Sequence, residues 1–280
     1  MKLEATVIVT RYKEPNSLLF DTIKSLFTQK GTSLEILILD QFYDNETEQF
    51  CKKLNSSGDH TFLYTLIDPI SLSYARNYGL KSAKNNIVIF IDSDAIAMDN
   101  WSYEIINLLK ENNQTRIVGT KILPKWNGKK NILTKSNYFS SVYSLLDLGD
   151  GVLNISKVIG ASFAVNKNNI EDIFFNENLG RKNGVLLGGE ETEFCDKVKL
   201  KGFNIQYTGK TYVLHQINQD RLQLTGLIER VVFLGVGRAM KGGLPSPHKT
   251  KKNIFDYLFF PLFLMFYGYG YIYGTLKYKK

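Results

Sequence analysis

The sequence predicts an α/β fold in which a mostly parallel, twisted sheet is flanked by helices. Four short runs rich in β-branched and aromatic residues alternate with helical patterns, as is typical of parallel strands joined by crossover helices. The runs cover residues 5–10, 34–39, 62–67 and 87–91. The last of them, IVIFI, is wholly apolar, which indicates a strand buried on both faces of the sheet.

The first crossover helix has a marked start and end. Pro15 lies where the helix begins, since proline is favoured in a first helical turn, and Gly31 follows its end. Leu19, Ile23 and Leu26 recur at the spacing that places apolar side chains on one face of a helix. The sequence therefore predicts an amphipathic helix that covers one face of the sheet.

The C-terminal part is predicted to be helical. An acidic first turn opens a helix over residues 190–202, and an amphipathic pattern covers residues 221–240. Residues 254–276 are rich in Phe, Tyr and Leu and are about long enough to cross a bilayer, but Asp256 and Pro261 interrupt them. We expect a helical, membrane-associating extension that lies on the membrane surface or forms a re-entrant hairpin, rather than a single crossing. A helix packed on the protein's own core or on a second subunit is the alternative.

Composition limits the function classes. The chain has 280 residues and a formal net charge of +8, with lysines on both sides of the apolar C-terminal segment. Nucleic-acid binding would need a basic stripe interleaved with exposed aromatic residues or a known module, and the sequence contains neither. No signal peptide is recognisable, so we expect the amino-terminal part to lie in the cytosol. The two cysteines, Cys51 and Cys195, are expected to be free thiols.

Two acids directly follow the apolar strand 87–91. Asp92 and Asp94 are one residue apart, and ligands in open α/β sheets bind outside the carboxyl ends of the strands. Mg²⁺ and Mn²⁺ bind through one or two carboxylates together with substrate phosphates, so the pair indicates a metal and a phosphate-bearing ligand. An acidic turn that caps the next helix is the alternative.

Five segments, in the right order, resemble motifs of family 2 glycosyltransferases, which have the GT-A fold. They are residues 7–12 (VIVTRY), 35–40 (EILILD), 72–79 (LSYARNYG), 90–94 (FIDSD) and 189–194 (GEETEF). These are similar to the family's first two strands, its Ala-Arg-Asn-x-Gly helix, its metal motif and its Glu-Asp catalytic motif. The resemblance, which runs from about residue 5 to residue 215, implies an inverting enzyme that transfers a sugar from a nucleotide diphosphate sugar.

The resemblance also implies roles for single residues. Asp94 would bind Mn²⁺ or Mg²⁺ directly and His215 would complete the metal shell, while Asp92 would hold the ribose, a metal-bound water or the ion itself. Glu191 would be the base that takes the proton of the acceptor hydroxyl, with Glu190 as second choice. Asp40 would accept a hydrogen bond from a pyrimidine N3, which uracil and thymine offer, so we expect a UDP- or dTDP-sugar. The expected nucleotide-sugar-binding residues are Thr10, Arg11, Tyr12, Glu14, Asp40, Arg76, Asp92 and Ser93.

Two departures from the family pattern concern the donor and the base. Gln41 stands where the family often has a second acid after Asp40, and Glu191 stands where the family has Asp. Three of these functional assignments also have a purely structural alternative. Arg11 and Glu14 can form a local ion pair, Arg76 can form a surface ion pair, and acids in a first helical turn are ordinary complements to the helix dipole.

We therefore expect three regions: a nucleotide-sugar-binding half (1–125), an acceptor-binding and catalytic half (126–218) and the membrane-associating extension (219–280). The expected acceptor is a glycan or lipid-linked glycan at the cytoplasmic face of the cell membrane. Trp126, Tyr138 and Tyr143 line either an acceptor site or the core. A sugar-phosphate nucleotidyltransferase and a non-catalytic, membrane-tethered sugar-nucleotide or glycan binding protein are the alternative functions. The nucleotidyltransferase would want a glycine-rich phosphate loop after the first strand, which residues 10–15 lack.

Overall fold

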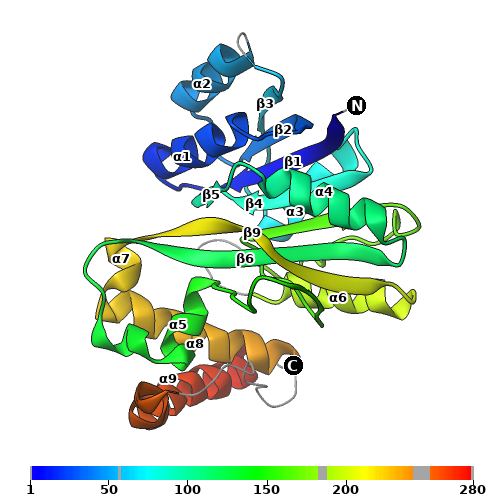
Figure 1. The fold of residues 1–280 in the computed structure, drawn as a ribbon. Coiled ribbons are helices and arrows are strands. Elements are labelled where there is room, and N and C mark those ends of the chain that lie inside the picture. The colour runs from blue at the N-terminus through cyan, green and yellow to red at the C-terminus, as the bar shows by residue number, and fades with distance from the viewer. Residues whose placement is uncertain (1, 56–57, 182–187, 242–252, 279–280) are drawn as a thin grey trace.

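A twisted sheet flanked by helices organises the protein (Figure 1). The structure is a computed structural model that describes residues 2–55, 58–181, 188–241 and 253–278. Within these residues the sheet has nine strands, in the order β3-β2-β1-β4-β8-β6-β9-β5, and β7 pairs with β9. The strands are β1 (Leu3–Arg11), β2 (Thr32–Asp40), β3 (Thr61–Leu66), β4 (Ile87–Asp92), β5 (Ala95–Ala97), β6 (Thr115–Asn127), β7 (Val152–Asn154), β8 (Ser162–Asn166) and β9 (Asn204–Asn218).

The N-terminal four strands are parallel. They are the four strands that the sequence predicts, and the predicted α/β class is confirmed. In the register, Arg11 pairs with Asp40 across β1 and β2, and Thr10 pairs with Asp92 across β1 and β4. The carboxyl ends of β2, β1 and β4 therefore meet at one edge of the sheet, where ligands of open α/β sheets bind.

The other half of the sheet is mixed. Strand β8 runs antiparallel to both β4 and β6, and the long strands β6 and β9 pair in parallel with a register shift between Thr120 and Lys121. Figure 1 shows β6 and β9 crossing the molecule between the N-terminal strands and the C-terminal helices. Strand β5 pairs antiparallel with β9, and in this pairing Ala95 lies opposite His215. This pairing carries the segment after Asp94 to the histidine that the sequence places in the metal site.

Two apolar layers cover the faces of the sheet. Because side chains alternate along a strand, Val7 and Val9 pack on one face and Ile8 packs on the other. The first face is covered by α1 (Asn16–Phe27), α2 (Asn45–Asn55) and α4 (Trp101–Glu111), and the second by α3 (Leu72–Ser82) and α6 (Glu190–Leu200). Cys51 and Cys195 are free and lie in these layers, as predicted.

A third apolar cluster joins the C-terminal helices to the 132–143 segment. It is formed by α5 (Asn137–Ser140), α7 (Gln219–Leu222), α8 (Leu224–Lys241), α9 (Ile254–Tyr278) and the 3₁₀ turns Ile132–Lys135 and Ser141–Tyr143. Tyr143 is fully buried here, and Trp126 and Tyr138 pack against the cluster. These three aromatic residues therefore serve core packing in the structure.

Helix α9 packs on α8 through glycines. A Cβ atom at Gly235 would collide with the Tyr267 carbonyl oxygen, and one at Gly270 would collide with the Val232 carbonyl oxygen. Only glycine permits so close an approach of the two helix backbones. At its start α9 is held by Asp256, whose side chain is buried and accepts hydrogen bonds from the Ser136 hydroxyl (2.9 Å) and from Asn137.

The expectation of a re-entrant hairpin is wrong, because Ile254–Tyr278 is one continuous helix with Pro261 inside it. Among the described residues, no helix combines the length and hydropathy that a membrane crossing requires. One face of α9 packs on the protein's own core, as the alternative expected. The interrupting Asp256 is thus a buried anchor of this helix, not a group that faces lipid.

Candidate active site

The predicted metal ligands lie together. One ligand atom each from Asp92, Asp94 and His215 falls within 4.8 Å of the others. Asp92 ends β4, Asp94 follows after one residue, and His215 is brought beside them by the β5–β9 pairing. The two carboxylates suit Mn²⁺ or Mg²⁺, and the imidazole nitrogen suits Mn²⁺ better than the harder Mg²⁺, so the residues fit Mn²⁺ best.

The hydrogen bonds of His215 fix which ring nitrogen faces the acids. Its Nδ1 lies 2.8 Å from the backbone carbonyl oxygen of Tyr143, and a carbonyl can only accept, so Nδ1 carries a proton. Its Nε2 lies 3.0 Å from Asp94 Oδ1. A carboxylate oxygen and a ring nitrogen at this distance need a proton or a cation between them. The histidine is therefore oriented as a metal-ligating imidazole usually is, with a carbonyl behind it.

The pKa values of the two aspartates are shifted in opposite directions. Burial raises the pKa of Asp92, and the adjacent charge of Asp94 raises it further. Burial acts on Asp94 in the same direction, but His215 and Arg221 outweigh it and hold the pKa of Asp94 well below its usual range. Asp94 is thus the more readily ionised member of the pair, which suits a carboxylate that binds a metal ion.

Arg221, which the sequence analysis did not assign, belongs to this cluster. Its Nη1 lies 3.0 Å from Asp94 Oδ2 and 3.4 Å from His215 Nε2. Burial keeps the pKa of Arg221 below its ordinary value, although Asp94 opposes the shift. The signal that could have identified it is its position six residues after His215, in the short helix α7 that immediately follows β9.

A second cluster centres on Arg76. Its side chain is 2% exposed, and its Nη1 lies 2.8 Å from Glu191 Oε1 and 3.2 Å from Glu190 Oε1. Its Nη2 lies 3.9 Å from Asp92 Oδ1. The surface ion pair considered for Arg76 is therefore wrong, because this guanidinium is buried and bridges the predicted base to the predicted metal site.

The two glutamates of this cluster have opposite pKa shifts. Burial raises the pKa of Glu190 to about 7, and the charge of Glu191 adds to this. Burial also acts on Glu191, but Arg76 outweighs it and keeps the pKa of Glu191 below its ordinary value. The side chain of Glu191 is 16% exposed and that of Glu190 only 3%. Glu191 is therefore the ionised and more accessible carboxylate.

Gly160 makes room for this arrangement. A Cβ atom at position 160 would collide with Glu191 Oε1 and come within 2.6 Å of Arg76 Nη2. The Gly160 carbonyl oxygen accepts a hydrogen bond of 3.4 Å from that same Nη2. The segment that precedes β8 thus forms one wall of the Arg76 cluster, and any side chain there would displace the pair.

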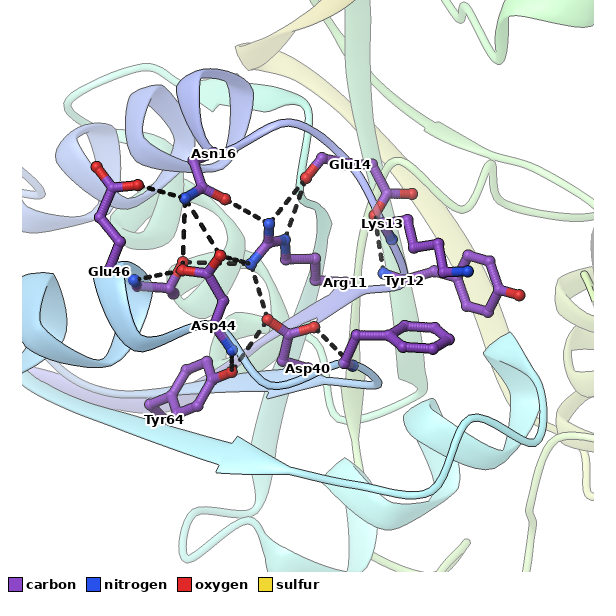
Figure 2. Close-up of polar contacts among 11 residues, drawn as sticks. Arg11, Tyr12, Lys13, Glu14, Asn16, Asp40, Asp44, Glu46 and Tyr64 are labelled. Carbon is purple, nitrogen blue, oxygen red and sulfur yellow. Dashed lines mark hydrogen bonds and ion pairs between the residues drawn. The ribbon is translucent and has the colours of Figure 1, made fainter.

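The predicted nucleotide end forms a separate polar network at the same edge of the sheet (Figure 2). Arg11 Nη1 lies 2.9 Å from Asp40 Oδ2 and 3.6 Å from Asp44 Oδ2. Asp40 Oδ2 also accepts from the Tyr64 hydroxyl at 3.2 Å, and Oδ1 accepts from the Phe42 backbone N–H at 3.1 Å. Both oxygens of the fully buried Asp40 are thus used within the protein, and burial raises its pKa.

The remaining predicted donor residues surround this network. The Arg11 guanidinium donates to the Glu14 backbone carbonyl at 3.1 Å, and the Glu14 carboxylate accepts from the Tyr12 N–H at 2.8 Å, so no Arg11–Glu14 side-chain ion pair forms in this part of the structure. The Tyr12 ring meets the Phe42 ring edge to face, with the ring centroids 5.1 Å apart. Thr10 and Ser93 lie buried at the ends of β1 and β4.

Comparison with known proteins decides the family. Residues 6–174, more than half of the chain, match the profile of glycosyl transferase family 2. The chain belongs to glycosyl transferase family 2. The predicted family is confirmed, and family membership decides against the nucleotidyltransferase alternative.

Relatives of this family 2 chain include two transferases. Glucosyl-dolichyl phosphate glucuronosyltransferase of Haloferax volcanii is 21% identical over 268 residues, which is 90% of this chain and 82% of that protein. The poly(ribitol-phosphate) β-N-acetylglucosaminyltransferase TarP of Staphylococcus aureus is 31% identical over 100 residues, which is 35% of this chain and 31% of TarP.

Solved structures share the fold of this family 2 chain. The crystal structure of GalNAc-T7 with UDP, GalNAc and Mn²⁺ has a TM-score of 0.59 and 14% identity, and the match covers 99% of this chain and 56% of that chain. The structure of S. aureus TarS 1–349 has a TM-score of 0.51 and 16% identity, covering 88% of this chain and 67% of that chain. At these identities the likeness establishes the fold.

Proposed function

We propose that this family 2 glycosyltransferase inverts the anomeric centre while it moves a sugar from a UDP- or dTDP-sugar to an acceptor hydroxyl. The observation that carries the proposal is the position of Arg76 between two acidic groups. It joins Asp92 of the metal cluster (3.9 Å) to Glu191 (2.8 Å), so the group that receives a proton adjoins the group that receives a diphosphate. Attack by the acceptor hydroxyl and departure of the diphosphate can then occur at the same anomeric carbon.

Each part of the reaction has a residue in this arrangement. A Mn²⁺ or Mg²⁺ held by Asp92, Asp94 and His215 would supply positive charge for the departing diphosphate. Glu191 would take the proton of the acceptor hydroxyl, because an alcohol is a poor nucleophile until its proton leaves. Arg76 would hold the Glu191 carboxylate in place, and its bond to Glu191 would loosen as the carboxylate becomes protonated. A hydroxyl that attacks opposite the diphosphate inverts the anomeric carbon in a single step.

Glu191 is our choice of base over Glu190. Its pKa lies below the ordinary value, so it is ionised at neutral pH, whereas burial raises the pKa of Glu190 to about 7. A neutral Glu190 can donate a hydrogen bond to Glu191 and reduce the basicity of that carboxylate. When Glu190 ionises, its charge would make Glu191 a stronger base. Glu190 would thus tune the base without contacting the acceptor.

For the nucleotide we favour UDP, because UDP is bound in the GalNAc-T7 structure and in a TarS 1–349 complex. Direct reading of the base by Asp40 requires one of its oxygens to exchange a protein partner for the base N3–H. Tyr12 and Phe42 lie beside that point and offer aromatic surface for the base. The dTDP-sugar alternative differs by one methyl group on the base and is tested in the same assay.

We further propose a lipid-linked or surface-polysaccharide acceptor at a membrane surface. The relatives' names describe transfer to a glucosyl-dolichyl phosphate and to poly(ribitol phosphate). Helix α9 presents a stripe of exposed apolar residues opposite its buried face, at spacings of three, four or seven residues along one side of the helix. The stripe consists of Ile254, Leu258, Met265, Tyr269, Ile272 and Leu276. A location at the cytoplasmic face stays a prediction.

The donor chemistry is tested by nucleotide release. The purified chain is incubated with Mn²⁺ and a panel that includes UDP-glucose, UDP-N-acetylglucosamine and dTDP-glucose, and the freed nucleotide diphosphate is measured. We expect release from at least one donor, a loss of about 100-fold or more in Asp94→Ala and Glu191→Gln, and no change in Asp196→Asn on the exposed side of α6. Unchanged release in Asp94→Ala would overturn the metal assignment. UDP binding without release, unaffected by Glu191→Gln, would favour the non-catalytic binding protein.

The membrane step is tested separately by vesicle flotation. Wild-type protein is mixed with vesicles of phosphatidylcholine, with or without phosphatidylglycerol, and should float with the anionic vesicles. Ile272→Glu should reduce the floating fraction about tenfold, because a charge replaces a side chain that would be buried in the interface. Leu200→Glu introduces the same charge at an 88% exposed residue of α6 and serves as the control. Wild-type protein that stays with the soluble fraction would contradict the membrane proposal and leave the donor chemistry intact.

A further inference from the structure

The Arg221 guanidinium shares its partners with the expected metal. Nη1 lies 3.0 Å from Asp94 Oδ2 and 3.4 Å from His215 Nε2. Because Nδ1 of His215 carries the proton that the Tyr143 carbonyl accepts, Nε2 is the ring nitrogen whose lone pair a metal ion would use. That lone pair cannot serve an arginine N–H and a metal ion at the same time. Metal ligation by His215 therefore requires Nη1 to give up this partner.

In the part of the chain that the structure describes, the Arg221 guanidinium also has unsatisfied hydrogen-bond donors. Arg221 Nε and Nη2 are buried and have no hydrogen-bond partner among the described residues, and the side chain is 11% exposed. Buried donors without acceptors are unfavourable, and they mark a place where another group is accommodated. Nε and an Nη of one arginine form a fork that matches two oxygens of a phosphate.

Positive charge accumulates around this side chain. Arg181 acts electrostatically on Arg221, on Asp92 and on Asp94. Burial, together with the charges of Arg221 and Arg181, lowers the pKa of Arg230 to about 10. Arg181 and Arg221 thus act on carboxylates of the metal cluster, and Arg230 lies near enough to both arginines to be affected by their charges. These guanidiniums repel one another, and an anion with several charges, such as a diphosphate, would relieve that repulsion.

The backbone of Arg221 is held while its side chain is free to change partners. The Tyr143 hydroxyl donates to the Arg221 carbonyl oxygen at 3.0 Å, and the Asn218 side chain accepts from the Arg221 N–H at 3.4 Å. Tyr143 therefore fixes both His215, through its carbonyl, and Arg221, through its hydroxyl. A rotation of the arginine side chain alone would move Nη1 away from His215 without disturbing Asp92, Asp94 or His215.

We propose that Arg221 exchanges Asp94 and His215 for the diphosphate of the nucleotide, so that the divalent ion and the nucleotide bind cooperatively through this one side chain. Without nucleotide, Arg221 competes with the ion for its ligands. With nucleotide, the fork takes up phosphate oxygens and leaves His215 Nε2 to the ion. The proposal rests on the proposed donor chemistry and adds to it a residue that couples binding of the divalent ion to binding of the nucleotide.

Calorimetry measures this coupling without any turnover. Mn²⁺ is titrated into the full chain alone and in saturating UDP, and the ratio of the two dissociation constants is the coupling factor. In Arg221→Gln, Mn²⁺ alone should bind more tightly than in wild type, UDP in saturating Mn²⁺ should bind about tenfold more weakly, and the coupling factor should fall about tenfold. Arg221→Lys, which keeps the charge but not the fork, should lie between the two.

A matched control and separate outcomes complete the test. Lys210→Gln removes one positive charge from an exposed residue of β9 and should leave all three constants unchanged. Weaker UDP binding in Arg221→Gln with unchanged Mn²⁺ affinity would overturn the competition, as would an unchanged coupling factor in a variant that circular dichroism shows to be folded. Wild-type protein that binds neither Mn²⁺ nor UDP would refute the proposed donor chemistry itself, and the inference would fall with it.

Discussion

Removal of the Arg76 guanidinium should destabilise the protein more than loss of an ordinary buried side chain. The substitution Arg76→Met keeps most of the apolar stem but leaves Glu190, Glu191 and Asp92 without the cation that lies 2.8 to 3.9 Å away. The side chain is 2% exposed, so water cannot replace the lost charge. Burial would then act on the carboxylates without opposition.

The expected loss is about 3–5 kcal/mol in the free energy of unfolding at pH 8, as for a buried ion pair from which one partner is removed. This is a large part of the roughly 5–15 kcal/mol that stabilises a typical domain. The loss should shrink toward pH 5. In wild type the lowered pKa of Glu191 contributes stability above its ordinary pKa of 4.5, so this contribution is still present at pH 5 and the change comes from the variant. Without Arg76 the carboxylates can be protonated instead, which removes the penalty at low pH.

Urea unfolding at pH 8 and pH 5, followed by far-UV circular dichroism, measures both effects. Arg116→Met is the control, because this buried arginine donates to the backbone carbonyls of Asn168 and Asn113 and has no carboxylate partner in the described structure. Its loss should be smaller and nearly independent of pH. Arg76→Met/Glu190→Gln should recover part of the stability at pH 8. A loss below about 1 kcal/mol at pH 8, or one equal at both pH values, would refute the electrostatic reasoning.

Two further predictions concern single residues. The pKa of Glu190 is raised to about 7, so its contribution to stability is present at pH 5 and is lost as the pH rises through 7. Glu190→Gln should therefore be more stable relative to wild type at pH 8 than at pH 5. A difference in urea midpoints that is the same at both pH values would disprove this. Gly270→Ala should lower the free energy of unfolding by about 1–3 kcal/mol, because its Cβ would collide with Val232, whereas Gly268→Ala, which meets no atom within 4 Å, should be neutral or slightly stabilising. Equal thermal midpoints for the two alanine variants would contradict the close crossing of α8 and α9.

The sequence predicted the parallel half of the sheet because its local signals agree with the fold. The runs that become β1 to β4 are apolar or alternating, and each of the first three is followed directly by a helix. The acids at the ends of these strands could be grouped because parallel strands end at one edge. Asp92, Asp94 and His215 lie together as the resemblance implied.

The sequence analysis did not predict the contacts between side chains that lie far apart in the chain. The Arg76 bond to Glu191 spans 115 residues, and nothing in the local pattern of α3 distinguishes a buried guanidinium from an exposed one. Arg221 was read as the start of an amphipathic helix, and only the β5–β9 register reveals that it faces Asp94. The hairpin expected at residues 254–276 does not form, because Pro261 lies inside one continuous helix and Asp256 anchors its start through Ser136.

The central claim is that Asp92, Asp94 and His215 bind a divalent ion together with a nucleotide diphosphate. Crystals grown with UDP and Mn²⁺ and measured at the manganese absorption edge would locate the ion directly by its anomalous signal. Our account predicts one peak within bonding distance of Asp94 and His215 Nε2, with the UDP diphosphate on its open side. Bound UDP with no peak there, or a manganese peak away from these ligands, would contradict it.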